Sequence, residues 1–313
     1  ITPQSGVTYY YWLAIKINGE TISISKTDSG YRAQAVVGIG AWGDDDKGQS
    51  TIPEELTEVI QVDAGSAHSI ALQSNGTVEV FGDNSLDQLD IPGNLTGVIA
   101  VAAGYFHNLA LKEDGRVVAW GWNTNGQANV PTNLENVIQV SGGGDFSLSL
   151  IDDGTVRAWG NNFARQTEVP KGLADAKQVA AGGSHALALI EDGTVVAWGN
   201  DADGQATVPF GLRDVVAVAA GKSHSLALKS DSTIVSWGSN KRGQLDFPVE
   251  INSPSKQGIS AQFNASSVVS IAAGFNHNLA LDADGNVIAW GDNTFSQATV
   301  PEALTGVENI AAG

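Results

Sequence analysis

The chain has 313 residues, a formal net charge of −18 and no cysteine. Such acidity argues against binding nucleic acid or an anionic membrane, because both need a surface of clustered Lys and Arg. The lack of cysteine excludes disulfide scaffolds, thiol catalysis and zinc–thiolate sites. No apolar run approaches the ~18 residues that span a bilayer, so we expect no membrane insertion.

Residues 1–34 do not follow the pattern of the rest of the chain. Residues 8–26 are two β-prone runs around Asn18-Gly19, a dipeptide typical of a type I′ hairpin turn. The residues GVTYYYWLAIKINGE and SKTDSGYRA resemble the last two strands of a bacterial fibronectin type III domain. That resemblance implies a modular parent protein that is secreted or attached to the cell surface. Since the chain contains no methionine, we expect it to be a processed or excised piece of such a protein.

Two isolated strands are marginally stable in water. We therefore expect residues 1–34 to form a hairpin and linker outside the main domain. The hairpin would either pack on the flank of that domain or pair with another chain in self-assembly.

From residue 35 onward, a unit of 39 residues recurs along the chain. Each copy carries an aromatic residue, then Gln and then Pro, as in Trp198, Gln205 and Pro209. The aromatic position is occupied by Trp42, Phe81, Trp120, Trp159, Trp198, Trp237 and Trp290. Only the last step is longer, because of an insertion over residues 249–265. We interpret the insertion as a tolerated surface loop, with a second contact site as the alternative.

Within one unit, three runs of β-prone residues are followed by a short extended piece. The runs are 177–181, 186–190 and 195–198, with the turn dipeptide Asp192-Gly193 between the last two, and the extended piece is 205–209. Four short strands cannot bury both faces of their own sheet. Units of this kind are typical of a β-propeller, in which each sheet covers its neighbours. We predict an all-β fold, a seven-bladed β-propeller with four-stranded blades, over the chain from residue 35 to residue 313.

The repeat is split between the two ends of the chain. The first-strand block ends in Gly seven times, and its seventh copy, Thr305 to Gly313, lies at the C-terminus. Conversely, the block around Trp42 has no complete first half. We expect residues 305–313 to supply the innermost strand of the blade near residues 35–53, so that pairing of N- and C-terminal segments closes the ring.

The repeated motif is clearest in AGYFHNLALKEDGRVVAWGWNTNGQANVP, AGKSHSLALKSDSTIVSWGSNKRGQLDFP and AGFNHNLALDADGNVIAWGDNTFSQATVP. These residues resemble the regulator of chromosome condensation repeat family. The short, uniform repeats are most similar to the bacterial secreted branch of that family, which includes a propeller-type β-lactamase inhibitor. The resemblance implies a binding scaffold with no catalytic residues to carry over.

All histidines share one repeat position, at His68, His107, His185, His224 and His277. Catalytic or metal-binding groups converge in space, whereas these are spread around a ring, so we interpret them as structural. Phe146 replaces the histidine in one repeat. The acidic stretches at residues 44–46 and 201–203 lack the oxygen ligands of a calcium loop. We expect no catalytic residue, no metal and no cofactor.

The loops at one end of the ring vary between repeats. Up-and-down topology places there the dipeptide between Gly and His, and the loop between Trp-Gly and Gln. The opposite end carries the near-constant Asp-Gly turn and the Val-Pro crossover. Large aromatic residues in variable loops are candidate binding residues, because such side chains are enriched at interface hot spots. The candidate partner-binding residues are Tyr105, Phe106, Trp122, Asp145, Phe163, Phe275, Asn276 and Phe295.

The sequence thus predicts a non-catalytic protein-binding scaffold module of a bacterial secreted or cell-surface protein. A glycan-binding adhesion module is an alternative, in which the same aromatic rings stack on sugars. Inhibition of a secreted enzyme such as β-lactamase is a further alternative. An enzyme would need carboxylates or Arg converging in the central channel, and the regular strand sequences do not suggest them.

Overall fold

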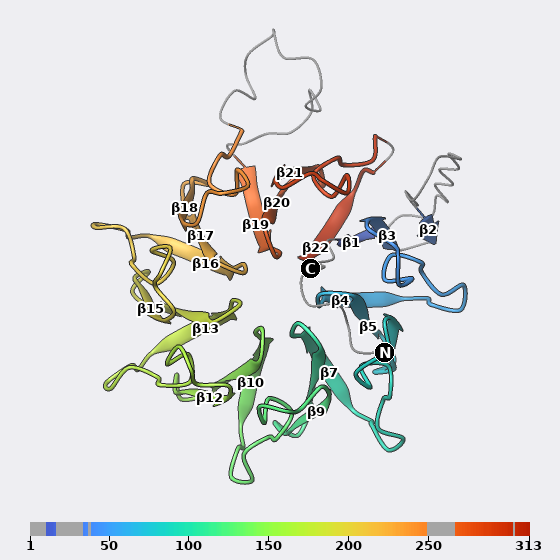
Figure 1. Cartoon of the computed structure of the whole chain (residues 1–313), viewed down its shortest axis with the longest axis horizontal. Coiled ribbons are helices and arrows are strands. Elements are labelled where there is room, and N and C mark those ends of the chain that lie inside the picture. Colours follow the sequence, from blue (N-terminus) through green and yellow to red (C-terminus); the bar gives the residue numbers. More distant parts are fainter. Residues whose placement is uncertain (1–10, 17–33, 37–38, 249–266, 303) are drawn as a thin grey trace, which may run out of the picture.

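The computed structural model describes residues 11–16, 34–36, 39–248, 267–302 and 304–313. Its regular elements over these residues are β-strands, arranged as antiparallel sheets around a ring (Figure 1). In the described part of the chain, no helix is long and apolar enough to cross a membrane. The insertion over 249–265 lies entirely outside the described residues.

Six of the sheets have three strands each, and we number them as blades 1 to 6 in chain order. Their inner strands are β4 (Val59–Ala64), β7 (Val98–Ala103), β10 (Val137–Gly142), β13 (Ala176–Ala181), β16 (Val215–Ala220) and β19 (Val268–Ala273). Their middle strands are β5 (His68–Gln73), β8 (His107–Lys112), β11 (Phe146–Ile151), β14 (His185–Ile190), β17 (His224–Lys229) and β20 (His277–Asp282). Their outer strands are β6 (Val78–Gly82), β9 (Val117–Gly121), β12 (Val156–Gly160), β15 (Val195–Gly199), β18 (Ile234–Gly238) and β21 (Val287–Gly291).

Blade 7 combines strands from both ends of the chain, in the order β22 (Val307–Ala312), β1 (Tyr11–Lys16), β3 (Ile39–Gly43) and β2 (Gln34–Val36). Strand β1 pairs antiparallel with β22 on one side and with β3 on the other. The inner strands contact one another in order around the ring, and β22 contacts both β19 and β4 (Figure 1).

The position of β1 corrects the predicted domain boundary. Residues 11–16 were assigned to a separate N-terminal hairpin, but in the structure they form the middle strand of a propeller blade. The reason lies in the repeat pattern, because Leu13-Ala14-Ile15 followed by Asn18-Gly19 matches Ile70-Ala71-Leu72 followed by Asn75-Gly76. The remainder of the predicted hairpin, at residues 1–10 and 17–33, lies outside the described residues.

The predicted fourth strand of each blade is also corrected, since blades 1 to 6 have three strands. The piece from Gln to Pro is not paired as a strand because its polar groups are used elsewhere. In blade 2, the main-chain carbonyl of Gln127 accepts hydrogen bonds from Trp159 Nε1 (2.9 Å) and Ser147 Oγ (2.9 Å) of the next blade. Pro131, which ends the piece, has no N–H to donate to a ladder.

Blades are joined by apolar packing as well as by these hydrogen bonds. Between blades 3 and 4, for example, Phe146, Leu148 and Leu150 pack with Ala186, Ala188 and Trp198 in one buried cluster. Equivalent clusters fill the other gaps between described blades. Each sheet therefore buries both of its faces against neighbours, which a single blade could not do alone.

Buried histidines form a second link between blades. The Nε2 atom of His107 lies 2.9 Å from Ser147 Oγ, and that of His185 lies 2.9 Å from Ser225 Oγ. His68 and His224 make the same contact with Asn108 and Asn278 of the following blades. Where Phe146 replaces histidine, the partner position is Ala186, and the two pack in the same apolar cluster. The polar pair is thus exchanged as a unit for an apolar pair.

Burial lowers the pKa of these imidazoles, to about 4 in His68 and His224 and to about 3 in His107 and His185. Because these native values lie below the unfolded value of about 6.5, the unfolded chain binds protons that the native chain does not as the pH falls. The stability that these neutral imidazoles contribute is therefore fully present above pH 6.5 and is lost progressively as the pH falls from 6.5 to about 3.

We expect the double variant His185→Phe/Ser225→Ala, which copies the Phe146–Ala186 pair, to weaken this acid sensitivity. Removing one titrating group should reduce the slope of unfolding free energy against pH, near pH 5, by about 1.4 kcal/mol per pH unit. Urea unfolding at pH values from 4.5 to 8 measures the slope. An unchanged slope in a folded variant would contradict the assignment of His185 as a neutral buried group.

We also expect removal of residues 305–313 to lower the melting temperature far more than the loss of nine residues suggests. The deletion leaves β1 and the inner strands β4 and β19 without their contacts to β22. Thermal unfolding checks this, with Glu308→Ala, at an exposed position of β22, as the control that should change little. An unchanged melting temperature after truncation would show that β22 is dispensable.

Candidate binding surface at one end of the channel

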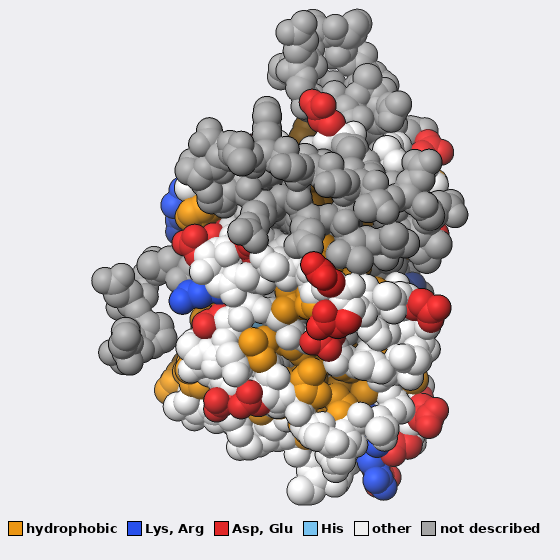
Figure 2. Space-filling view, turned by 90° about the vertical axis from the view of Figure 1, so that its right-hand side faces the viewer, with side chains coloured by type: hydrophobic (Ala, Val, Ile, Leu, Met, Phe, Trp, Pro, Cys, Tyr) orange, Lys and Arg blue, Asp and Glu red, His pale blue; other side chains and the backbone are white. Residues whose placement is uncertain are grey.

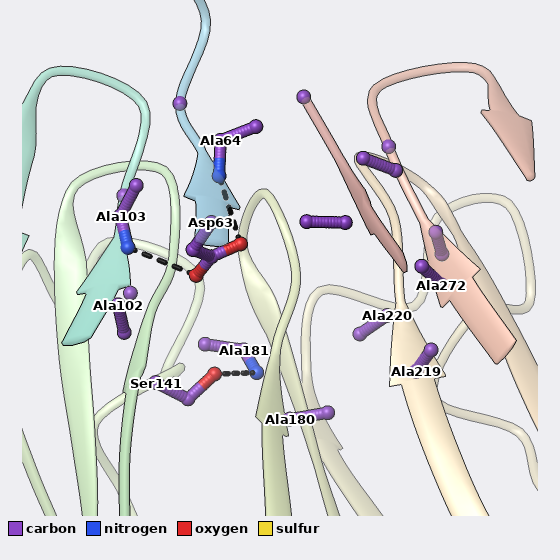
Figure 3. A pocket seen from close by; sticks show the side chains of 18 of the residues that line it. Asp63, Ala64, Ala102, Ala103, Ser141, Ala180, Ala181, Ala219, Ala220 and Ala272 are labelled. Carbon is purple, nitrogen blue, oxygen red and sulfur yellow. Dashed lines mark hydrogen bonds between the residues drawn. The ribbon is translucent and has the colours of Figure 1, made fainter. Parts of the chain in front are cut away.

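The inner strands surround a central cavity of about 290 Å³. Small residues line it, among them Ala64, Ala102, Ala181 and Ala219, which come from the inner strands of several blades (Figure 3). Seven strands converging on one axis leave little room for longer side chains, which accounts for the repeated Ala and Gly. Among the described residues that line the cavity, Asp63 is the one carboxylate.

Asp63 ties blade 1 to blade 2. Its carboxylate accepts hydrogen bonds from the main-chain N–H groups of Ala64 and Ala103, both at 2.9 Å (Figure 3). Ser141 has the equivalent role in blade 3, where its hydroxyl accepts from the N–H of Ala181 at 3.0 Å. Burial raises the pKa of Asp63 to about 6, although the two N–H donors oppose that rise. The carboxylate therefore links two blades, a role that the hydroxyl of Ser141 fills at the equivalent position of blade 3.

The loops between inner and middle strands form a ring of hydrogen bonds at one end of the cavity. Each of these loops begins with a glycine, and we call the six residues that follow it the collar: Ser66, Tyr105, Gly144, Gly183, Lys222 and Phe275. Each collar N–H donates to a carbonyl of the next blade, as from Gly144 to Gly182 (3.1 Å) and from Phe275 to Gly313 (3.2 Å). Because the main chain fixes these loops, the collar side chains are presented from a rigid frame.

The glycine before each collar residue is required by the histidine packing. A Cβ atom on Gly182 would overlap the ring of His185 and approach Gly221 O to 2.5 Å. The loop can therefore fold back over the histidine only with glycine at this position.

Four of the predicted partner-binding residues form one continuous aromatic band across the collar. The rings of Tyr105 and Phe275, from blades 2 and 6, have centroids 5.1 Å apart. Tyr105 also meets Phe106 edge-on at 6.4 Å, and Phe106 meets Trp122 edge-on at 5.8 Å. Lys222 extends the band, with its Nζ atom 3.9 Å from the centre of the Phe275 ring.

Tyr105 lies across the collar because the neighbouring loops carry glycine. A Cβ atom on Gly183 would come within 2.6 Å of Tyr105 Oη, and one on Gly144 would lie 3.2 Å from its ring. Phe275 is buried, while Tyr105, Phe106 and Trp122 are half-buried. The band thus combines internal packing with ring surface that remains accessible.

The other predicted residues lie apart from the band. Phe163 is 94% exposed, and Phe295 is 40% exposed, each in a loop between an outer strand and its Gln. Asp145 is half-buried, and burial raises its pKa while a hydrogen bond from Asn161 opposes the shift. Asn276 accepts a hydrogen bond from Gln244 Nε2 at 3.1 Å, which ties it to the neighbouring blade.

Asp residues of the acidic stretches at 44–46 and 201–203 accept hydrogen bonds within their own loops. Asp45 accepts from the N–H of Ser50 and the hydroxyl of Thr51, and Asp201 accepts from the N–H of Ala206. Asn occupies the same position in other repeats and makes the same bond, as from Leu89 N to Asn84 Oδ1. Over the described part of the chain, no three His, Asp or Glu side chains gather as a metal site would require.

Two features of the surface were missed in the sequence. All collar residues occupy one repeat position, so the ring of loops brings Tyr105 and Phe275 together although 170 residues separate them. In addition, the exposed aliphatic residues at the opposite end went unnoticed, because they lie in strands that read as buried.

These observations define the class of protein as a seven-bladed propeller of short, uniform repeats with variable loops at one end. Six stretches match the Regulator of chromosome condensation (RCC1) repeat, at residues 59–88, 98–127, 137–166, 176–205, 215–244 and 268–297. The matches cover more than half of the chain, which therefore belongs to the RCC1 repeat family. Each match starts at an inner strand and ends at the repeated Gln.

Solved structures show the same fold at low sequence identity. Yeast RCC1 (Prp20), in a crystal structure with Kap60 bound, is 23% identical, with a TM-score of 0.64 over 83% of this chain and 76% of that one. Human WBSCR16 is 18% identical, with a TM-score of 0.65 over 96% and 93%. The ectodomain of the Arabidopsis thaliana receptor kinase ACR4 is 20% identical, with a TM-score of 0.61 over 81% and 88%. A comparison with curated protein sequences gives no match.

We expect Asp63→Ser to stabilise the protein at neutral and alkaline pH. The native pKa of Asp63 lies above the unfolded value, so its contribution to stability declines as the pH rises from about 4 to 6. Serine keeps a hydroxyl to accept from Ala103, as Ser141 does, and should gain about 1–3 kcal/mol at pH 8 but little at pH 4. Urea unfolding at the two pH values measures the difference.

The matched control is Ser141→Ala, which removes the tie without a charge change and should destabilise equally at both pH values. If Asp63→Ser destabilised the chain at pH 8 as well, the ionised carboxylate would be a net stabilising group.

Proposed function

We propose that this chain is a non-catalytic protein-binding module that uses the aromatic band of the collar as its principal contact. The observation that carries the proposal is the band itself, formed by Tyr105, Phe106, Trp122 and Phe275 on a rigid ring of loops. Aromatic side chains held in place lose little conformational freedom on binding, so more of their contact free energy appears as affinity.

Three further features support this surface. Phe163 and Phe295 add exposed rings at the same end of the blades, and Lys222 adds a positive charge beside Phe275. The loops that carry these residues differ between repeats while the strands do not, as expected where a shared scaffold takes on one specific partner. The structure of yeast RCC1 with Kap60 bound is an example of a related propeller in complex with a protein.

We further propose that the parent protein is bacterial and is secreted or held at the cell surface. The support is the resemblance of residues 6–33 to the end of a fibronectin type III domain, and that of the repeats to the secreted branch of the family. Strand β1, which falls inside this stretch, also matches the repeat pattern of the propeller.

Glycan binding is the second candidate. The half-buried rings of Phe106 and Trp122 offer accessible faces on which sugar rings could stack. A glycan array distinguishes this candidate from protein binding, and titration of a β-lactamase with excess propeller tests the inhibitor alternative.

The decisive experiment compares the chain with its variant Phe106→Ala/Trp122→Ala. A binding protein is isolated from the secreted and surface proteins of the source organism on the immobilised chain, then purified and measured by calorimetry. We expect the variant to lose about 2 kcal/mol of binding free energy, the range of an interface hot spot. The control is Thr132→Ala, at an exposed position of the crossover that follows blade 2, which should bind as tightly as the unaltered chain. Full affinity in the aromatic variant, with an unchanged melting temperature, would refute the collar as the contact.

A further inference from the structure

Exposed apolar side chains are concentrated at the end of the ring opposite the collar. Among the described residues, eight large hydrophobic side chains are exposed, and only Phe163 and Phe295 belong to the collar end. The other six are Ile60, Ile99, Ile138, Phe210, Val216 and Val269. Five of these occupy one repeat position, the second residue of the inner strands β4, β7, β10, β16 and β19.

The structure places this position beside the Asp-Gly turns. The N–H of Val137, which precedes Ile138, donates to the carbonyl of Gly115 in the turn of the previous blade at 3.1 Å. Val215, which precedes Val216, makes the same bond to Gly193. Phe210 lies in the crossover that leads into β16. We call the five strand residues the aliphatic ring.

A β-bulge exposes the aliphatic ring. In β4 the register shifts between Val59 and Gln61, so Ile60 has no partner in β5, and the same shift occurs in the other four strands. The five side chains are between 50% and 55% exposed. Blades 4 and 7 carry Lys177 and Glu308 at this position, so the fold does not require an apolar residue there.

Carboxylates surround the aliphatic ring. The residues before the inner strands include exposed Glu58, Asp175 and Asp214, and the turns contribute exposed Glu113, Asp114, Asp152, Asp153, Glu191, Asp192, Asp231 and Asp284. Basic groups are fewer than these carboxylates: Arg116 and Lys229 pair with Asp114 and Asp231, Arg157 lies near Asp153, and Lys177 and Arg213 lie near Asp192. Figure 2 shows one edge of the molecule, where Asp and Glu side chains and apolar atoms alternate over the described surface with few Lys or Arg.

We propose that the aliphatic ring is a docking surface for a polypeptide segment that carries aliphatic or aromatic side chains next to Lys or Arg. Apolar side chains of the segment would cover the β-branched residues, and its basic groups would face the surrounding carboxylates. A second copy of this chain fits less well, because it would bring one acidic end against another. The aliphatic ring and the collar lie at opposite ends of the propeller, so the proposal gives the propeller one binding surface at each end.

The test uses synthetic peptides as probes, measured by fluorescence anisotropy at 0.05 M and 0.3 M salt. The probe is a labelled peptide of alternating Leu and Lys, and the two controls alternate Leu with Glu and Ser with Lys. We expect the Leu–Lys peptide to bind at both salt concentrations and to bind more tightly than either control. If the Ser–Lys peptide bound as tightly as the Leu–Lys peptide, charge alone would account for binding and the proposal would be overturned.

Variants then locate the site on the molecule. Ile60→Thr/Ile99→Thr/Ile138→Thr keeps β-branched residues in three adjacent blades and should weaken the Leu–Lys peptide at least tenfold. Lys177→Ile, which extends the ring between Ile138 and Val216 and removes a positive charge, should strengthen it several-fold, a gain that misfolding cannot produce. Phe106→Ala/Trp122→Ala, at the collar, should leave it unchanged.

The proposal is overturned if the triple variant, with an unchanged melting temperature, binds as tightly as the unaltered chain, or if the collar variant alone loses binding. It is also overturned if light scattering finds a dimer that the triple variant dissociates, because a second copy would then occupy the ring.

Discussion

The main-chain carbonyl of the repeated glutamine is the point on which the blade arrangement depends. In five described blades it accepts from the indole N–H of the next blade, and where Phe81 replaces tryptophan, Ser69 alone donates to Gln49 at 2.6 Å. Where Ala186 cannot donate, Trp198 alone bonds to Gln166. Each of these buried carbonyls accepts at least one hydrogen bond, because a buried acceptor without a donor would destabilise the folded state. Spacing between aromatic residue, Gln and Pro is therefore fixed, while the loops between them are free to vary.

The repeat period, the all-β class and the number of blades could be predicted from sequence, because tight turns and interblade donors recur at fixed intervals. The absence of a fourth strand could not be predicted. β-propensity does not reveal that the carbonyl of Gln205 accepts a hydrogen bond from Trp237 Nε1 rather than from a neighbouring strand. The role of β1 was missed because a long stretch of sequence separates it from its partner β3, the strand that contains Trp42. The loop positions of Tyr105 and Phe275 follow from the repeat pattern, but the contact between the two rings arises only when the propeller ring is formed. The aliphatic ring was invisible because a bulge, not composition, exposes it.

The two ends of the propeller differ in their chemistry for a topological reason. The main chain of each collar loop is held by hydrogen bonds to the next blade, so the collar side chains can be large without disturbing the strands. The turns at the other end need residues that accept positive φ or bond to their own backbone, which favours Asp, Asn and Gly. An acidic rim is therefore a by-product of turn chemistry, while the bulged position beside it carries Ile, Val, Lys or Glu in different blades.

Blade 7 also constrains how the chain reaches its native state. Its inner strand β22 and middle strand β1 lie at opposite ends of the sequence, so their pairing has nearly the largest sequence separation the chain allows. Blades 1 to 6 form from contiguous segments and can assemble as synthesis proceeds, whereas β1 must wait until the last strand has emerged. Until then, β1 presents an unpaired strand edge and β4 lacks one neighbour. A completed chain nearby could insert its own β22 there, so synthesis of several copies from one messenger would favour exchange of β22 between chains.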